Sequence, residues 1–203
     1  MSRYTGPRLK VMRALGVDLP GLSPKTIEKR PYPPGQHGQA RKKPTEYALR
    51  LREKQKIRMG YGLTEAQLRR LVKEAKASKS PTGEKLVELV ERRLDNVVFR
   101  AGFARTIPAA RQLVRHGHVQ VGGRRVDVPS YRVSRGEVVS LAERSHAHPD
   151  VVTALATAPS FETPWLAVDT KARTASVSAL PDGSSVPFAL NVQLVVEYYS
   201  QRL

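Results

Sequence analysis

Residues 92–141 decide the fold of this chain, and they read RRLDNVVFRAGFARTIPAARQLVRHGHVQVGGRRVDVPSYRVSRGEVVSL. From Leu86 to Ala101, apolar side chains recur at intervals of three and four residues, which is the spacing of a buried helix face. We therefore predict one continuous helix through residues 86–101. Gly102 suits the position that follows the last turn of such a helix.

A second helix is expected to follow in the same segment. Thr106 can cap its first turn, Pro108 is tolerated there, and Gly117 is placed to end it. The side chains that this helix should bury are Ile107, Ala110, Leu113 and Val114.

A hairpin is expected directly after this helix. Gly122-Gly123 is a two-residue signal for a tight turn. The apolar residues of the two alternating runs that it joins are Val119 and Val121 on one side and Val126 and Val128 on the other. A further apolar run at residues 138–141 indicates a third strand.

The same segment carries an uncompensated positive charge, because ten arginines stand against three acidic residues for a net charge of +7. Arg111 and Arg115 are four residues apart and hence neighbours on one helix face, where two like charges cost about 0.2–0.5 kcal/mol. A solvated surface is the plainer explanation, but the absence of lysine and the few interleaved acids favour an anionic partner. Arginine suits phosphate because its planar guanidinium donates two hydrogen bonds together.

Composition points the same way. The chain has 203 residues, a net charge of +17 and a sequence pI of about 10.6, which is usual for a protein that binds a polyanion. It has no cysteine, so a disulfide framework and a thiolate metal site are excluded. No apolar run approaches the ~20 residues of a membrane helix, and residues 1–10 lack the apolar core of a signal peptide. We expect a cytoplasmic protein with a nucleic-acid partner and no membrane partner.

The charge is unevenly distributed along the chain. Residues 1–60 carry +11, residues 61–91 carry +1 and residues 142–203 carry −2. Two basic regions therefore flank a nearly neutral helical connector, and a different surface follows at the C-terminus. This distribution predicts a bipartite contact with a polyanion.

Residues 109–133, AARQLVRHGHVQVGGRRVDVPSYRV, resemble a small RNA-binding module. The module is shared by the fourth protein of the small ribosomal subunit, some pseudouridine synthases and bacterial tyrosyl-tRNA synthetases. In that family, two helices and a hairpin form the surface that faces RNA. The positions that match it here are Arg105, Arg111, Gln112, Arg115, His116, His118, Arg124, Arg125, Ser130 and Tyr131.

The remainder of the chain resembles the ribosomal family and not the other two. The matching stretches are MSRYTGPRLKV at residues 1–11, YPPGQHG at 32–38, YALRLREKQKIRMGYGLTEAQLRR at 47–70 and ALNVQLVVEYYSQRL at 189–203. Leu9 and Met12 stand where many bacterial relatives carry two cysteines of a zinc site. The chain thus resembles the zinc-free form of this family, in which apolar contacts replace the metal. We expect no metal site and no cofactor.

The resemblance implies further RNA contacts outside the module. By this likeness, the rRNA-binding positions are Arg3, Tyr4, Arg8, Lys10, Arg30, Tyr32, His37, Arg50, Lys54, Lys56, Arg58, Tyr61, Arg69 and Arg93. Arg41, Lys42 and Lys43 are implied to approach mRNA at its entry channel. Asn191, Glu197, Tyr198 and Tyr199 are implied contacts with the fifth protein of the small subunit, although both tyrosines are equally compatible with a place in the core.

The other elements follow from local signals. Residues 8–15 can form a short helix, and residues 45–59 a longer basic one with Tyr47 and Leu51 facing inward. Thr64 and Gln67 form a capping box at the start of the next helix. Short elements are expected at residues 149–156, 165–168 and 175–178. Asn191 can cap a last helix, for which a strand is the alternative because valine is frequent there.

We find no constellation of catalytic residues. Arg93-Leu94-Asp95 resembles the Arg-Leu-Asp of a pseudouridine synthase active site, but the chain leaves little room for a catalytic domain. Asp95 is instead expected to pair with a neighbouring arginine or to cap a turn. An RNA-modifying enzyme and a stand-alone RNA chaperone are the alternatives to a structural, non-enzymatic role.

The predicted fold class is α+β, in three parts. A basic, extended N-terminal arm spans residues 1–44. A helical domain spans residues 45–91 and is completed by residues 180–203. The RNA-binding module, with two helices and an antiparallel hairpin or sheet, spans residues 92–179 with its core at 92–141.

The resemblance implies a structural component of the bacterial small ribosomal subunit that binds 16S rRNA. It also implies early assembly of the 5′ domain of that RNA, an influence on translational accuracy through the fifth protein, and a place near the mRNA entry channel. No small-molecule substrate is implied.

Overall fold

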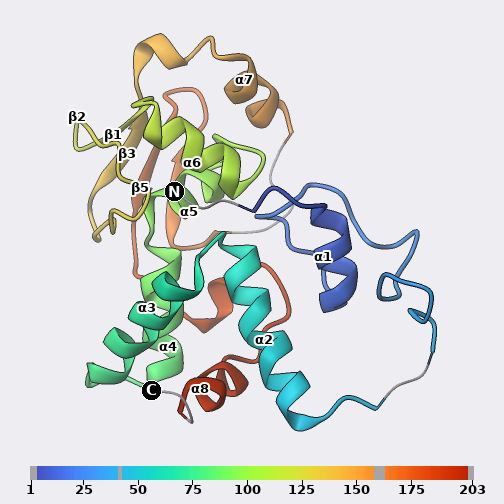
Figure 1. Cartoon of the computed structure of the whole chain (residues 1–203). Coiled ribbons are helices and arrows are strands. Elements are labelled where there is room, and N and C mark those ends of the chain that lie inside the picture. The colour runs from blue at the N-terminus through green and yellow to red at the C-terminus, as the bar shows by residue number, and fades with distance from the viewer. Residues whose placement is uncertain (1–3, 41–42, 158–162, 201–203) are drawn as a thin grey trace. The chain divides into compact units, whose positions relative to one another are not determined.

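The computed structural model describes residues 4–40, 43–157 and 163–200 (Figure 1). The chain divides into two compact units, residues 1–86 with 186–203, and residues 87–185. The first unit is helical and the second combines helices with an antiparallel sheet, so the α+β class is confirmed. The three-part division expected from the sequence stays a prediction. In the described ranges, no helix is long and apolar enough to cross a membrane.

The first unit is built from helices α1 (Arg8–Leu15), α2 (Glu46–Gly60), α3 (Glu65–Ala77), α8 (Val192–Ser200) and the first part of α4 (Thr82–Glu91). Helix α8 packs against α2 and α3, although more than a hundred residues separate them in the chain. The capping box of Thr64 and Gln67 is confirmed, since each side chain accepts the backbone N–H of the other. Asn191 caps α8 as expected by accepting from the Leu194 N–H, and the strand alternative is excluded there.

The N-terminal arm has an apolar cluster of its own. Met12, Leu19 and Leu22 are buried together, and the ring of Phe188 packs against them. Met12, which stands at one of the two positions implied to hold zinc cysteines in relatives, is completely buried. The structure therefore shows an apolar contact at this position, as the resemblance implied.

Helix α2 differs from its predicted orientation. Tyr47 was expected to face inward but is exposed, and Leu51 is only half-buried. The buried positions of α2 include Glu53 and Lys54, which pair with Lys56 and Glu65 respectively. Charged residues that form ion pairs are thus among the covered positions of this basic helix, which an apolar pattern does not record.

The second unit contains α5 (Leu94–Arg100), α6 (Ile107–Arg115), α7 (Pro149–Ala156) and a five-stranded antiparallel sheet. The strands are β1 (Val119–Val121), β2 (Arg124–Arg125), β3 (Val138–Leu141), β4 (Leu166–Asp169) and β5 (Thr174–Val177). Their order is β2-β1-β3-β5-β4. Two short 3-10 turns, η1 (Glu143–Ser145) and η2 (Gly183–Ser185), complete the unit. Helices α5 and α6 pack against each other beside the sheet (Figure 1).

The predicted continuous helix of residues 86–101 is wrong, because it is broken between α4 and α5. Arg93 has an extended backbone (φ −65°, ψ 137°) and forms a β-bridge with Arg132. The N–H of Leu94 donates to the carbonyl of Tyr131 at 2.8 Å, and the N–H of Val133 donates to the carbonyl of Arg92 at 2.9 Å. These backbone bonds to residues some forty positions downstream replace the helical bonds that the apolar stripe predicted.

The second helix and the hairpin agree closely with the prediction. Thr106 caps α6 by accepting from the Ala109 N–H, and Gly117 follows the helix with φ +72°. Gly122 and Gly123 both have positive φ, as a tight turn of this kind requires. The second strand is shorter than expected, however: β2 ends at Arg125, and Val128 is exposed.

Glu65 links α2, α3 and α8 and gives the first unit a predicted acid sensitivity. Its carboxylate accepts from Lys54 at 2.9 Å and from the Tyr199 hydroxyl at 2.7 Å. Partial burial raises the pKa of Glu65, but the hydrogen bonds from Lys54 and Tyr199 lower it and prevail. Because the pKa is lowered on folding, this stabilisation is complete above the ordinary value of 4.5 and is lost as the pH falls through the lowered value.

We therefore expect Glu65→Gln to lower the free energy of unfolding by about 1 kcal/mol at pH 7. Its difference from the wild type should shrink as the pH falls below 4.5 and through the lowered pKa of Glu65, because the wild-type carboxyl then becomes protonated too. Chemical unfolding followed by circular dichroism at a series of pH values measures this. Glu28→Gln, at an exposed position in the arm, is the control. A difference that stayed constant with pH would contradict the expectation.

Candidate nucleic-acid interface

Asp95 at the start of α5 organises two of the arginines predicted to bind RNA. Its carboxylate is 1% exposed. It accepts from Arg93 at 2.9 and 3.1 Å and from Arg111 at 2.7 and 3.1 Å. The expectation that Asp95 pairs with a neighbouring arginine is therefore confirmed. A carboxylate held in this way by two guanidinium groups is not placed to act as a catalytic base.

Two further arginines of residues 92–141 also have carboxylate partners within the fold. Arg100 is completely buried and pairs with the equally buried Glu91, which also accepts from the Asn96 amide at 2.7 Å. Arg92 pairs with Glu88 at 2.7 Å. Much of the predicted positive charge therefore stabilises the fold. The sequence did not reveal this, because Glu88 and Glu91 lie before the segment.

Five of the other basic groups of residues 92–141 are exposed on or beside α6 and the hairpin, and we call them the α6–hairpin face. Its residues are Arg105, Arg115, His116, Arg124 and Arg125, and all five are exposed. Arg105 precedes α6, Arg115 and His116 end it, and the Gly-Gly turn places the last two in β2. Among the described residues, none of these four arginines forms an ion pair with a carboxylate.

Gly117 has a particular role in this face. A Cβ atom at this position would overlap the guanidinium of Arg125. Any larger residue would displace the Arg125 guanidinium from its present place beside the end of α6. The backbone conformation, with φ +72°, also favours glycine. The module thus brings cationic groups of the helix and the hairpin together, as expected for a surface that meets phosphates.

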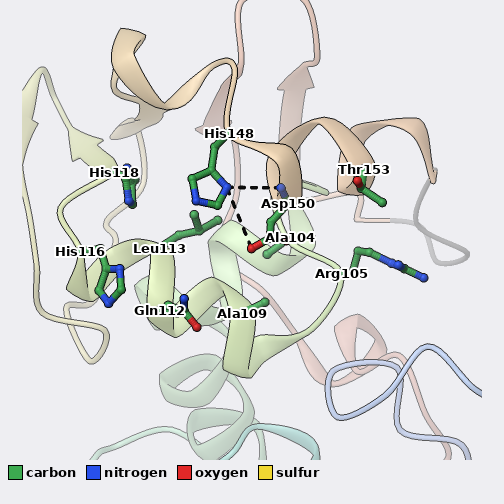
Figure 2. A pocket seen from close by; sticks show the side chains of 10 residues that line it. All are labelled: Ala104, Arg105, Ala109, Gln112, Leu113, His116, His118, His148, Asp150 and Thr153. Atoms are coloured by element: carbon green, nitrogen blue, oxygen red, sulfur yellow. Dashed lines mark hydrogen bonds and ion pairs between the residues drawn. The ribbon is translucent and has the colours of Figure 1, made fainter.

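A pocket of about 380 Å³ adjoins this face, and we call it the α6–α7 pocket (Figure 2). Its lining residues are Ala104, Arg105, Ala109, Gln112, Leu113, His116, His118, His148, Asp150 and Thr153. The predicted positions Arg105, Gln112, His116 and His118 thus meet here. Residues of α7 were not predicted as part of a site, since their sequence gives only a short helix signal.

The pKa of His118 is lowered, first by burial and then by electrostatic interaction with its neighbours His148 and Arg144. Its Nδ1 lies 2.7 Å from the Ser145 hydroxyl. At neutral pH this imidazole is therefore held in its uncharged form. Tyr131, another predicted position, is half-buried and donates its hydroxyl to Glu137 at 2.8 Å, whereas Ser130 is exposed.

The predicted RNA contacts of the first unit fall into two groups. Tyr4, Lys10, Arg30, His37 and Arg69 are exposed, as is Lys43 of the predicted mRNA-entry group. The others take part in internal contacts or are partly covered. Three of them form ion pairs: Arg50 with Glu46 and Glu197, Lys54 with Glu65, and Lys56 with Glu53. Arg8 donates to the Leu22 carbonyl, the Tyr32 ring lies under the Arg13 guanidinium, the Tyr61 ring packs on Phe188, and Arg58 is half-buried. Arg3, Arg41 and Lys42 lie outside the described residues. The roles of all these residues in RNA contact stay predictions.

The predicted contacts with a neighbouring protein have structural roles inside the first unit. Tyr198 and Tyr199 are buried, so the core alternative describes their position. Glu197 pairs with Arg50 at 3.0 Å, and Asn191 caps α8. Among the described residues, no group of three or more histidines and carboxylates is arranged to hold a metal ion.

Two family models together match residues 3–139 of the 203-residue chain. Residues 3–91 match the Ribosomal protein S4/S9 N-terminal domain, and residues 92–139 match the S4 domain. The second match begins at Arg92, next to the break between α4 and α5. A protein of Methylobacillus flagellatus named small ribosomal subunit protein uS4 is 57% identical over the full length of both chains.

The chain belongs to the uS4 family of small ribosomal subunit proteins. Other members align with it over their full length too, among them the uS4B protein of Nitrosomonas europaea at 53% identity and the uS4 protein of Synechocystis at 51%. The family is structural rather than enzymatic, so the RNA-modifying alternative is excluded by the same comparison that shows the family. The resemblance stated from the sequence is thereby confirmed.

The buried carboxylate of Asp95 leads to a stability prediction. Asp95→Ala leaves the guanidinium groups of Arg93 and Arg111 without their common partner, and breaking a buried pair in this way costs about 3–5 kcal/mol. Denaturant unfolding should show a loss of this size. Asp127→Ala, at an exposed position in the same unit, should change the free energy of unfolding by less than about 0.5 kcal/mol. Equal effects of the two variants would show that the Asp95 pairs contribute little to folding.

Proposed function

We propose that this chain is a structural component of the small ribosomal subunit that binds 16S rRNA through the α6–hairpin face. The observation that supports this most strongly is the division of the arginines within residues 92–141. Arg92, Arg93, Arg100 and Arg111 have carboxylate partners within the fold, whereas Arg105, Arg115, Arg124 and Arg125 are exposed. Membership of the uS4 family supplies the partner that such a face requires.

The proposed contact with rRNA depends on the charge of the phosphates and on the shape of the folded RNA. Cationic side chains that neutralise phosphates release counterions from the RNA, and this release favours binding at low salt concentration. Folded RNA is recognised mostly through its backbone and shape rather than its sequence. A face supported by α6 and by a short hairpin presents its guanidinium groups from an ordered backbone and is suited to such a partner.

We extend the proposal to the role of the protein in the subunit. It binds early, holds helices of the 5′ domain together and thereby promotes assembly. The arm, with exposed Lys43 beside Arg41 and Lys42, approaches the mRNA entry channel. The region around α8 meets the fifth protein, and this contact influences decoding accuracy. The likeness to the family supports these finer roles, and the high positive charge of residues 1–60 is consistent with them.

A charge reversal on the hairpin tests the RNA contact. Arg124→Glu places a negative charge on an exposed position directly after the Gly-Gly turn. It should weaken binding to small-subunit rRNA by about tenfold or more. The slope of the logarithm of the binding constant against the logarithm of salt concentration should fall by the amount expected for about one lost phosphate contact. Filter binding or fluorescence titration at several salt concentrations measures both effects.

The matched control is Lys171→Glu, because Lys171 is exposed in the turn between β4 and β5. Strand β4 lies at the opposite edge of the sheet from β2. The same change of charge should have little effect there. Arg111 is not a suitable site for this test, because a change at Arg111 also removes a partner of Asp95. If Arg124→Glu and Lys171→Glu weakened binding equally, the proposed face would not be the contact surface.

A further inference from the structure

The α6–α7 pocket lies between the RNA-facing helix and a helix that the sequence comparison of the module does not include. Residues 92–139 match the S4 domain, whereas α7 begins at Pro149. Figure 2 shows His148, Asp150 and Thr153 on the α7 side and Ala109, Gln112 and Leu113 on the α6 side. The volume of about 380 Å³ falls in the range of small-molecule sites, about 300–1,000 Å³.

The lining of the pocket suits a flat, partly polar ring. Leu113 and Ala104 are buried apolar residues beneath it. Three imidazole rings stand around it, with centroids 5.4 Å apart for His118 and His148 and 6.2 Å apart for His116 and His118. Unstacked bases of RNA are commonly held by stacking on aromatic side chains, histidine among them. The lowered pKa of His118 keeps at least one of these rings uncharged at neutral pH.

Asp150 and Thr153 supply acceptors on the α7 side of the pocket. The carboxylate of Asp150 is largely exposed. The hydroxyl of Thr153 already donates to the Pro149 carbonyl at 2.8 Å, so its oxygen has only acceptor capacity left. A carboxylate repels phosphate but accepts from the N–H groups on the edge of a base. The interior of the pocket therefore favours a base, while phosphate is favoured at Arg105 on its border and at Arg115 nearby.

We propose that the α6–α7 pocket receives one unpaired base of the bound RNA, with guanine the best fit. Guanine presents two neighbouring N–H donors on its Watson–Crick edge, which match the two oxygens of the Asp150 carboxylate. Arg105 and Arg115 then contact the phosphates on either side of this nucleotide. The inference rests on the proposed RNA binding and adds to it a base-specific contact that involves α7.

The test fills the pocket without adding a ring that could itself stack on the base. Thr153→Leu places a larger apolar side chain in the lining. Val152→Leu is the matched control, since Val152 is the adjacent exposed residue of α7 and does not line the pocket. Both variants should have circular dichroism spectra and melting temperatures close to those of the wild type.

The intact protein is bound to small-subunit rRNA, and affinity is measured together with the reactivity of unpaired guanines toward kethoxal, which modifies the Watson–Crick edge. The wild type and Val152→Leu should protect one unpaired guanine. Thr153→Leu should restore its reactivity and weaken binding by a factor of about 5 to 150, the range for one stacked base. Asp150→Asn should weaken binding to this RNA more than binding to the same RNA with adenine at that position.

The possible failures are distinguishable. If the wild type binds the RNA, and Arg124→Glu weakens that binding, but Thr153→Leu leaves both affinity and guanine reactivity unchanged, the pocket proposal is overturned and the proposed function stands. If the wild type does not bind small-subunit rRNA, the proposed function itself fails. Adenine bound as well as guanine by the wild type would overturn the assignment to guanine.

Discussion

The buried carboxylate of Asp95 is the constraint on which the second unit depends. It accepts hydrogen bonds from Arg93 at the break before α5 and from Arg111 on α6, so one side chain of α5 joins this helix to α6 and to the segment that precedes α5. A buried charge is costly unless it is paired and hydrogen-bonded, and here both conditions are met. The pairing fixes α6 against α5, and α6 in turn carries the exposed groups of the α6–hairpin face.

The same constraint explains why positive charge alone is a poor guide to an RNA-binding surface. Arg100 and Arg115 belong to the same basic segment, yet the first is buried against Glu91 and the second is exposed. Arginine serves both purposes because its guanidinium donates several hydrogen bonds in fixed directions, either to a carboxylate within the protein or to a phosphate outside it. The acidic residues of the chain decide between these outcomes. The net charge of +17 is the positive charge that the carboxylates of the chain do not balance, and it is available to an anionic partner.

Helix α7 shows how a part outside the common module can change what a site recognises. The α6–hairpin face presents cations, and cations alone distinguish little among RNA sequences. The α6–α7 pocket adds imidazole rings and a carboxylate beside that face. In our proposal, the arginines position the RNA backbone while the pocket selects a base, so the two groups of residues contribute differently to affinity and to specificity.

The sequence by itself determined the local elements and the kind of partner. The cap at Thr106, the Gly122-Gly123 turn and the capping box at Thr64 involve residues a few positions apart, so their signals are complete in a short window. The likeness of nearly the entire chain to one family determined the class of function. The break at Arg93, the pairing of Arg111 and the pocket beside α7 were decided by tertiary structure. Each depends on groups that lie far from it in the sequence, such as the carbonyl of Tyr131 for the break and His148 for the pocket. A periodic pattern records which side chains are apolar, but it does not record which distant backbone or carboxylate will meet them.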